Sequence, residues 1–187
     1  MLRTRLVASA AFVACLLPAY AFAASWKIRP AESSVTITAQ QQGASFNGAF
    51  KTFDAQIAFD PADLGHSSVT ATVDTGSFDS QSADRDAQVK TATWFDVAKF
   101  PQARFVSDSF KDLGGGKYEA QGKLTIRDVS KDAVLPFTLK IDGPVAHMEG
   151  TLAIVRTEYG VGMGEWATSN WVGKDVKVNI QLVADKQ

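Results

Sequence analysis

The sequence contains very few of the side chains that usually carry out chemistry. Its one cysteine, Cys15, lies in an apolar leader segment, and its two histidines are His66 and His147. Nucleophilic and acid–base catalysis depend on such groups, and neither histidine has a second histidine or a cysteine at zinc-ligand spacing. No G-x-S-x-G motif is present. We therefore predict a protein that is not an enzyme, with no catalytic and no metal-binding residues.

Strong net charge is also missing. The chain has 19 basic and 20 acidic residues, a formal charge of −1, and loss of Arg3 and Arg5 with a leader would take it two units lower, to −3. Nucleic acids and anionic lipid head groups attract strongly basic surfaces. We expect no nucleic-acid partner, and stability that rests on packing, because residues 24–187 contain no cysteine for a disulfide.

The first 23 residues are typical of a secretory signal. Arg3 and Arg5 precede an uncharged apolar run over residues 6–17, and Ala21-Phe22-Ala23 follows as a small-x-small cleavage site. This pattern predicts a signal peptide over residues 1–23, cleavage between Ala23 and Ala24, and a periplasmic protein. Lipidation at Cys15 is an alternative, but the residues before this cysteine are a poor acceptor context.

Residues 24–187 are long enough for one domain with a sizeable core, and alternation of apolar and polar residues dominates them. Such alternation indicates strands with one buried and one wet face, as in an antiparallel sheet. The predicted strands cover residues 34–40, 53–59, 69–73, 118–127, 135–141, 146–154 and 176–182. We predict an all-β fold, an extended antiparallel barrel of about eight strands with one or two short helices. The small inward residues that would leave space inside are Ala120, Gly122, Ala146 and Gly150.

One helix is predicted, beginning after Ser82, which can cap it, and running into Trp94-Phe95 before Phe100-Pro101. The aromatic segment 94–101 has two interpretations, a lid over a cavity or a corner pinned by core aromatics. Arg85, with Asp84 or Asp86, could bind a polar ligand head or anchor the helix.

Two glycine-containing segments are also ambiguous. Asn47-Gly48 fits either a hairpin turn or a bulge within a longer strand. The stretch 160–166 resembles a phosphate loop but lacks the following helix and lysine, so an irregular strand is favoured.

Large apolar residues are plentiful, whereas reactive ones are scarce. Four tryptophans and ten of the twelve phenylalanines lie after residue 23, the other two being Phe12 and Phe22. Shaped apolar surface suits the enclosure of an apolar molecule. The residues predicted to line a cavity are Phe46, Phe50, Trp94, Phe95, Phe105, Leu124, Ile126 and Trp166.

The ordered motifs along the chain resemble those of the YceI-like proteins of the bacterial envelope. The matching stretches are Trp26-Lys27-Ile28, Phe46-Asn47-Gly48-Ala49-Phe50, Trp94-Phe95-Asp96, Phe100-Pro101, the run from Tyr118 to Ile126, Leu135-Pro136-Phe137 and Tyr159-Gly160-Val161-Gly162. One departure is Arg127-Asp128, where the family often has a glycine in the turn. The resemblance implies a lipocalin-like barrel over residues 24–187 with a long apolar cavity for polyisoprenoids, isoprenoid quinones or similar amphiphiles.

Together these points predict a periplasmic carrier for an isoprenoid-type lipid, with no cofactor other than such a bound lipid. One alternative is an enzyme acting on an apolar substrate inside the barrel, which would need a buried polar cluster such as Arg85 with Asp86. Another is an accessory module for a quinone-handling protein of the inner membrane. The oligomeric state is left open, a dimer included.

The leader assignment makes a direct prediction. When the full chain is expressed in a secreting bacterium, the intact mass of the exported form should correspond to a chain that begins at Ala24. A mass that retains residues 1–23, or one that carries a lipid at Cys15, would contradict the assignment.

Overall fold

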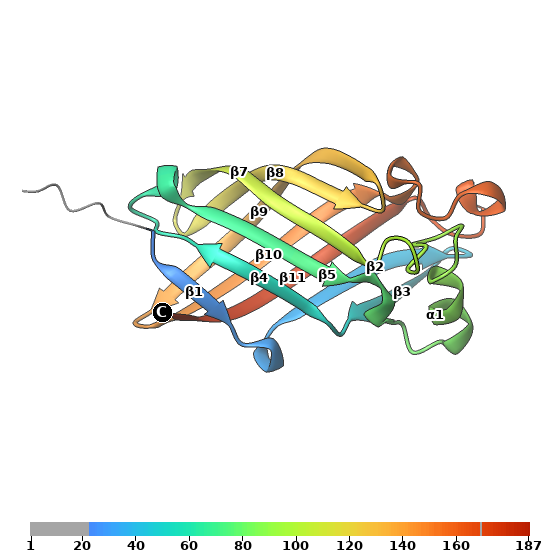
Figure 1. Cartoon of the computed structure of the whole chain (residues 1–187), viewed down its shortest axis with the longest axis horizontal. Helices are drawn as coiled ribbons and strands as arrows, with labels where there is room; N and C mark the ends of the chain where they lie inside the picture. The colour runs from blue at the N-terminus through green and yellow to red at the C-terminus, as the bar shows by residue number, and fades with distance from the viewer. Residues whose placement is uncertain (1–22, 169) are drawn as a thin grey trace, which may run out of the picture.

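A computed structural model describes residues 23–168 and 170–187, so all of the predicted leader except Ala23 lies outside the described residues. The described chain forms one antiparallel sheet of 11 strands with one α-helix (Figure 1). The strands are β1 (Ser25–Ile28), β2 (Ser34–Gln41), β3 (Ala44–Phe50), β4 (Phe53–Ala58), β5 (Ser68–Asp74), β6 (Phe78–Asp79), β7 (Gln102–Gly114), β8 (Lys117–Ile126), β9 (Val129–Asp142), β10 (Val145–Val155) and β11 (Asp175–Lys186). The helices are α1 (Ala83–Val89) and the 3-10 turns η1 (Pro30–Glu32), η2 (Leu64–His66), η3 (Thr75–Ser77), η4 (Arg156–Tyr159) and η5 (Gly164–Ala167).

Eight of the strands close into a barrel, in the order β1-β4-β5-β7-β8-β9-β10-β11 and back to β1. The short strand β1 closes the ring, because Trp26 lies opposite both Ile57 of β4 and Lys186 of β11. β11 first pairs with β2, and β2, β3 and β6 extend the sheet beside α1. The predicted antiparallel barrel is confirmed. No described helix has the length and apolar character that a membrane span requires.

Asn47-Gly48 is neither a turn nor a bulge. Both residues lie within β3, opposite Thr38 and Ile37 of β2, and the hairpin turns instead at Gln42-Gly43, where both φ angles are positive. Gly48 lies directly under the ring of Phe78, which leaves no room for a Cβ. Both sequence interpretations were therefore wrong, and the glycine serves close packing.

The helix is shorter than predicted, ending at Val89 instead of running into Trp94-Phe95. Thr91 Oγ1 donates to the Gln88 carbonyl oxygen (2.7 Å), and the backbone N–H of Phe95 donates to the Val89 carbonyl oxygen (2.9 Å). The chain therefore folds back on the helix end. Ser82 is the N-cap residue, but its side chain makes no capping hydrogen bond.

A β-bulge in β7 changes which of its side chains point inward. Phe105 lies opposite Leu124 of β8, the register shifts between Ser107 and Ser109, and Phe110 then lies opposite Ala120. A bulge adds one residue to one strand and so reverses the alternation beyond it. Gly122 lies opposite Ser107, where a Cβ would come within 2.8 Å of the Ser107 Cα. The absence of a side chain at Gly122 makes room for the bulge, and the bulge turns Phe110 inward.

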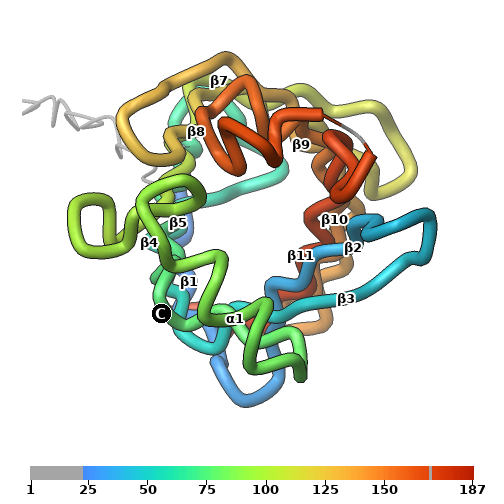
Figure 2. Tube along the Cα trace, turned by 90° about the vertical axis from the view of Figure 1, so that its right-hand side faces the viewer, coloured from blue at the N-terminus to red at the C-terminus, as the bar shows by residue number. Residues whose placement is uncertain are grey.

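Two apolar clusters lie along the inside of the barrel, and Leu124 and Ile154 pack against both. The cluster nearer the β1 end contains five packed aromatic residues, here called the aromatic floor: Trp26, Phe59, Phe110, Tyr118 and Phe137. The other cluster, here called the cap, lies at the α1 end and is built on Phe78, Val89, Trp94, Ile126, Tyr159, Val161 and Val172. Figure 2 shows the barrel from this end, with α1 along its rim.

A buried arginine holds the cap together. Arg156 is 3% exposed, and its guanidinium donates to five backbone carbonyl oxygens, those of Val161, Gly162, Trp166, Val172 and Gly173. Burial lowers the pKa of this guanidinium from its ordinary value. Residues 160–166, which resemble a phosphate loop in sequence, therefore contribute carbonyl oxygens that surround a cation.

Replacement of this arginine should loosen the cap strongly. Arg156→Met leaves several buried carbonyl oxygens without a partner, each at a cost of about 1–3 kcal/mol, so the free energy of unfolding should fall by about 3 kcal/mol or more. The exposed Arg104 on β7 is a matched control, since Arg104→Met should change it by under about 0.5 kcal/mol. Urea titrations of both variants measure the difference, and equal losses would contradict this role of Arg156.

Candidate ligand cavity

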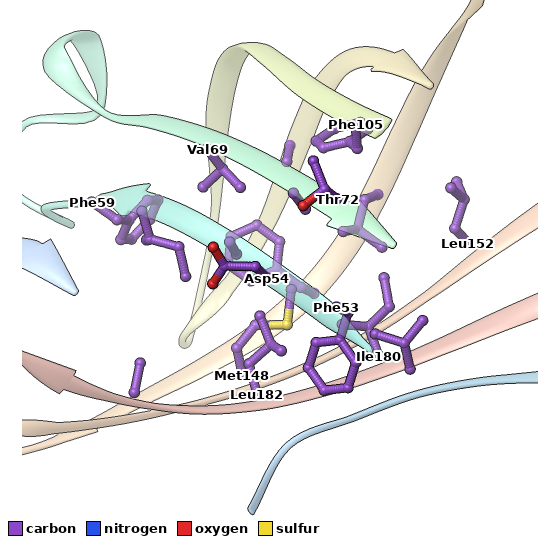
Figure 3. A pocket seen from close by; sticks show the side chains of 18 of the residues that line it. Phe53, Asp54, Phe59, Val69, Thr72, Phe105, Met148, Leu152, Ile180 and Leu182 are labelled. Atoms are coloured by element: carbon purple, nitrogen blue, oxygen red, sulfur yellow. The ribbon is translucent and has the colours of Figure 1, made fainter. Parts of the chain in front are cut away.

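The barrel contains a cavity of about 190 Å³ whose lining atoms are almost entirely apolar. Trp26, Phe59, Phe110 and Phe137 of the aromatic floor form part of its wall. Figure 3 places Phe59 at one end of the pocket and Phe105 and Leu152 toward the other. The cavity thus lies in the middle of the barrel, with the aromatic floor at one end.

Alanines contribute to the inner wall of the cavity from several strands. Ala55 of β4 lies opposite Ala71 of β5, and Ala103 of β7 lies opposite Val73, all with side chains on the inner face. Strands β8 to β11 supply longer side chains to the same cavity, for example Leu124, Leu135, Leu152, Met148, Ile180 and Leu182. Short and long apolar side chains thus alternate around the cavity, and the short ones leave space between the long ones.

Only half of the predicted small inward residues contribute to this space. Ala120 and Ala146 line the cavity, whereas Gly122 and Gly150 do not. A Cβ on Gly150 would lie 3.0 Å from the carbonyl oxygen of Pro136 and 3.1 Å from Leu135 Cδ1. The two glycines accommodate close contacts in the wall and leave no space inside it.

The volume of the cavity limits the size of the ligand that it can enclose. At about 190 Å³, the cavity is larger than an engineered apolar cavity of about 150 Å³ that binds benzene. It therefore has room for an apolar group of at least that size.

Two titratable residues, Asp54 and Arg104, border the cavity. Both belong to wall strands, but they are exposed and alternate with the inward residues Ala55 and Ala103. Among the described residues, no group of three or more His, Cys, Asp or Glu side chains could hold a metal ion. The buried polar cluster that the enzyme alternative requires does not appear in this lining.

The residues predicted to line a cavity divide between the cavity and the cap. Phe105 and Leu124 line the cavity. The other six, Phe46, Phe50, Trp94, Phe95, Ile126 and Trp166, belong to the cap or pack against it. Within the cap, Phe50 lies 6.1 Å from Phe95 and Trp94 lies 5.9 Å from Trp166, measured between ring centroids.

Arg85 and Asp86 fasten α1 to the neighbouring strands and do not line the cavity. The guanidinium of Arg85 lies 4.1 Å from the centre of the Phe46 ring, and its Nε donates to Gln41 Oε1 (3.1 Å). The carboxylate of Asp86 accepts from both the backbone N–H (2.8 Å) and the hydroxyl (2.6 Å) of Ser80. These contacts favour the anchoring interpretation over the ligand-head interpretation.

Sequence reasoning missed the aromatic floor as part of the site. Alternation identifies Phe137 as inward, and Trp26 and Phe59 are visible as large apolar residues near strand ends. For Phe110 the signal was a change of phase, since Ala103 and Phe105 are inward at odd positions and Phe110 is inward at an even one. A break in alternation along one strand is the signature of a bulge.

Two UPF0312 proteins of Vibrio species are similar to this chain in sequence. A UPF0312 protein of Vibrio cholerae is 35% identical over 122 residues, which are 64% of this chain and 65% of that protein, slightly less than two thirds of its length. A UPF0312 protein of Vibrio parahaemolyticus is 33% identical over 144 residues, which are 75% of this chain and 74% of that protein.

Solved structures share the architecture. BcnA from Burkholderia cenocepacia has a TM-score of 0.81 and 36% identity, covering 83% of this chain and 98% of that one. A polyisoprenoid-binding domain from Saccharophagus degradans has a TM-score of 0.69 and covers 88% of this chain and 99% of that one, and at 14% identity the likeness is one of fold alone. The family model for the YceI-like domain matches residues 26–184. Because this match spans nearly all of the described chain, the protein belongs to the YceI-like domain family.

Proposed function

We propose that this protein is a periplasmic carrier that holds the apolar tail of an isoprenoid-type lipid inside the barrel. The observation that carries the proposal is the cavity in the middle of the barrel, whose lining surface is almost entirely apolar. The polyisoprenoid-binding domain with the same fold supports the choice of ligand class. The leader over residues 1–23 supports the periplasm as the compartment.

Burial of the tail supplies enough free energy for binding without an ion pair. Each buried methylene contributes about 0.8 kcal/mol, so a ten-carbon tail contributes about 8 kcal/mol before the costs of association. The Phe and Leu side chains of the wall also exclude water from the tail. Selectivity for the polar head group then depends on the residues at the end of the cavity where the head group lies.

A direct test is extraction of the protein purified from its native host. Native mass spectrometry should show an adduct, and the organic extract should contain an amphiphile with an apolar tail of at least ten carbons. Protein that retains no lipid and takes none up from mixed isoprenoid lipids would contradict the proposal.

Filling the cavity at an alanine position should weaken binding. Ala71→Phe places a ring in the space that the tail occupies, so affinity for an isoprenoid alcohol such as farnesol should fall at least about tenfold, the effect of excluding two or more methylenes. Thr70→Phe is the control, because Thr70 neighbours Ala71 in β5 and does not line the cavity. Displacement of a fluorescent apolar dye, with circular dichroism to confirm folding, gives both affinities, and equal affinities would count against this site.

A further inference from the structure

The geometry points to Lys186 as the residue that receives the polar head of the bound amphiphile, and to a head group with a single negative charge, a carboxylate. This inference rests on the proposed function and narrows its ligand class. It places the mouth of the cavity at the end of the barrel where β9 turns into β10 and where β11 ends (Figure 1).

The inner face of the barrel is open to solvent beside Ile141. This residue of β9 lines the cavity and is 37% exposed, which makes it the most exposed apolar residue of the lining. It lies opposite Ala146 of β10, which in turn lies opposite Ala184 of β11, and both alanines also line the cavity. Solvent therefore meets the cavity wall at a point that the rings of the aromatic floor leave uncovered.

Lys186 continues the inner face of β11 at this mouth. Ile180, Leu182 and Ala184 line the cavity at alternate positions of the strand, and side chains two residues apart in a strand share a face. Lys186 also lies directly opposite Trp26 of β1, another lining residue. The Cβ atoms of such a pair are about 4.5–5.5 Å apart. The lysine is thus the next inner-face residue beyond the apolar wall.

The backbone on both sides of Lys186 is fixed, whereas its side chain is available to a ligand. The N–H of Lys186 donates to the Pro144 carbonyl oxygen (2.7 Å), and the N–H of Gln187 donates to that of Ser25 (2.9 Å). The side chain is exposed and forms no salt bridge within the part of the chain that the structure describes. A lysine stem can lie along apolar surface while its ammonium group stays in water. This position suits the boundary between a buried tail and a hydrated head.

The nearby charges favour a head with one negative charge. Arg29 forms an ion pair with Asp185 (2.6 Å), and Lys140 forms one with Asp142 (2.8 Å), so these cations already have partners. The single ammonium group of Lys186 matches one carboxylate, with which it can form a charge-assisted hydrogen bond. A diphosphate head would need further cations beside it.

The opposite wall of the barrel disfavours an anion. Asp112 of β7 lies opposite the inward residue Tyr118, and its carboxylate accepts from the backbone N–H of Gly114 (2.7 Å). β7 is four strands away from β11 in either direction around the ring. A negatively charged head is therefore repelled from the Asp112 side and attracted to the Lys186 side.

Farnesol and farnesoic acid, which share a tail and differ in the head, test this assignment at a pH at which the acid is ionised. Displacement of an apolar fluorescent dye gives both affinities. Lys186→Met keeps an apolar stem and removes the charge, so the ratio of acid affinity to alcohol affinity should fall about three- to fivefold, the upper range for an exposed ion pair. High salt should reduce this difference, and Lys186→Arg should retain the original ratio.

Lys27→Met is the matched control. Lys27 is exposed at the same end of the barrel, and it alternates with the inward residue Trp26, so its side chain belongs to the outer face. The substitution removes the same charge without touching the mouth and should leave the ratio unchanged. Farnesyl diphosphate serves as a third ligand, which should bind no more tightly than farnesoic acid. Circular dichroism confirms that each variant is folded.

The outcomes separate this inference from the proposed function. If neither farnesol nor farnesoic acid displaces the dye, the proposed function fails and this inference fails with it. If farnesol binds but the ratio is the same in Lys186→Met, or falls equally in Lys27→Met, Lys186 does not receive the head and the proposed function stands. Tighter binding of farnesyl diphosphate than of farnesoic acid would overturn the assignment of a carboxylate head.

Discussion

The interior of an eight-stranded barrel is just wide enough for side chains to fill, so the sizes of the inward residues decide whether a cavity exists. In this protein the two ends are packed by different means. Five aromatic rings pack at the floor, and a buried arginine gathers backbone carbonyl oxygens in the cap. Between them, alanines from both halves of the barrel, such as Ala71 and Ala146, lie among longer apolar side chains. The cavity is the volume that these short side chains leave.

Sequence alternation predicted the strands of the second half of the barrel well, because β8 to β11 are long, regular and joined by local hairpins. It did not find the inward turn of Phe110, since a bulge depends on what the partner strand offers, here Gly122. The prediction that Gly122 and Gly150 leave space inside the barrel was also wrong. A missing side chain can serve close packing of the backbone as well as open a void, and only the neighbours distinguish the two.

The residues predicted to line the cavity fall into two groups. Phe105 and Leu124 face the cavity, whereas the aromatics near residues 46–50 and 94–95 build the cap. Size and apolar character are the same in both places, so composition could not separate them. What separates them is the course of the chain after Val89, where hydrogen bonds fold residues 90–100 back over the helix end. Arg85 and Asp86 are likewise engaged with Gln41 and Ser80 of the same region.

The strand that closes the barrel is the first of the described strands, and it pairs with the last. Trp26 of β1 lies opposite Lys186 of β11, and Arg29 forms an ion pair with Asp185, at 2.6 Å, across the same junction. Contacts between residues so far apart in sequence raise the contact order, and high contact order slows folding. The native barrel therefore cannot form until the chain has been synthesised almost to its last residue. A polypeptide that closes so late leaves the edge strands of its barrel unpaired for longer during synthesis.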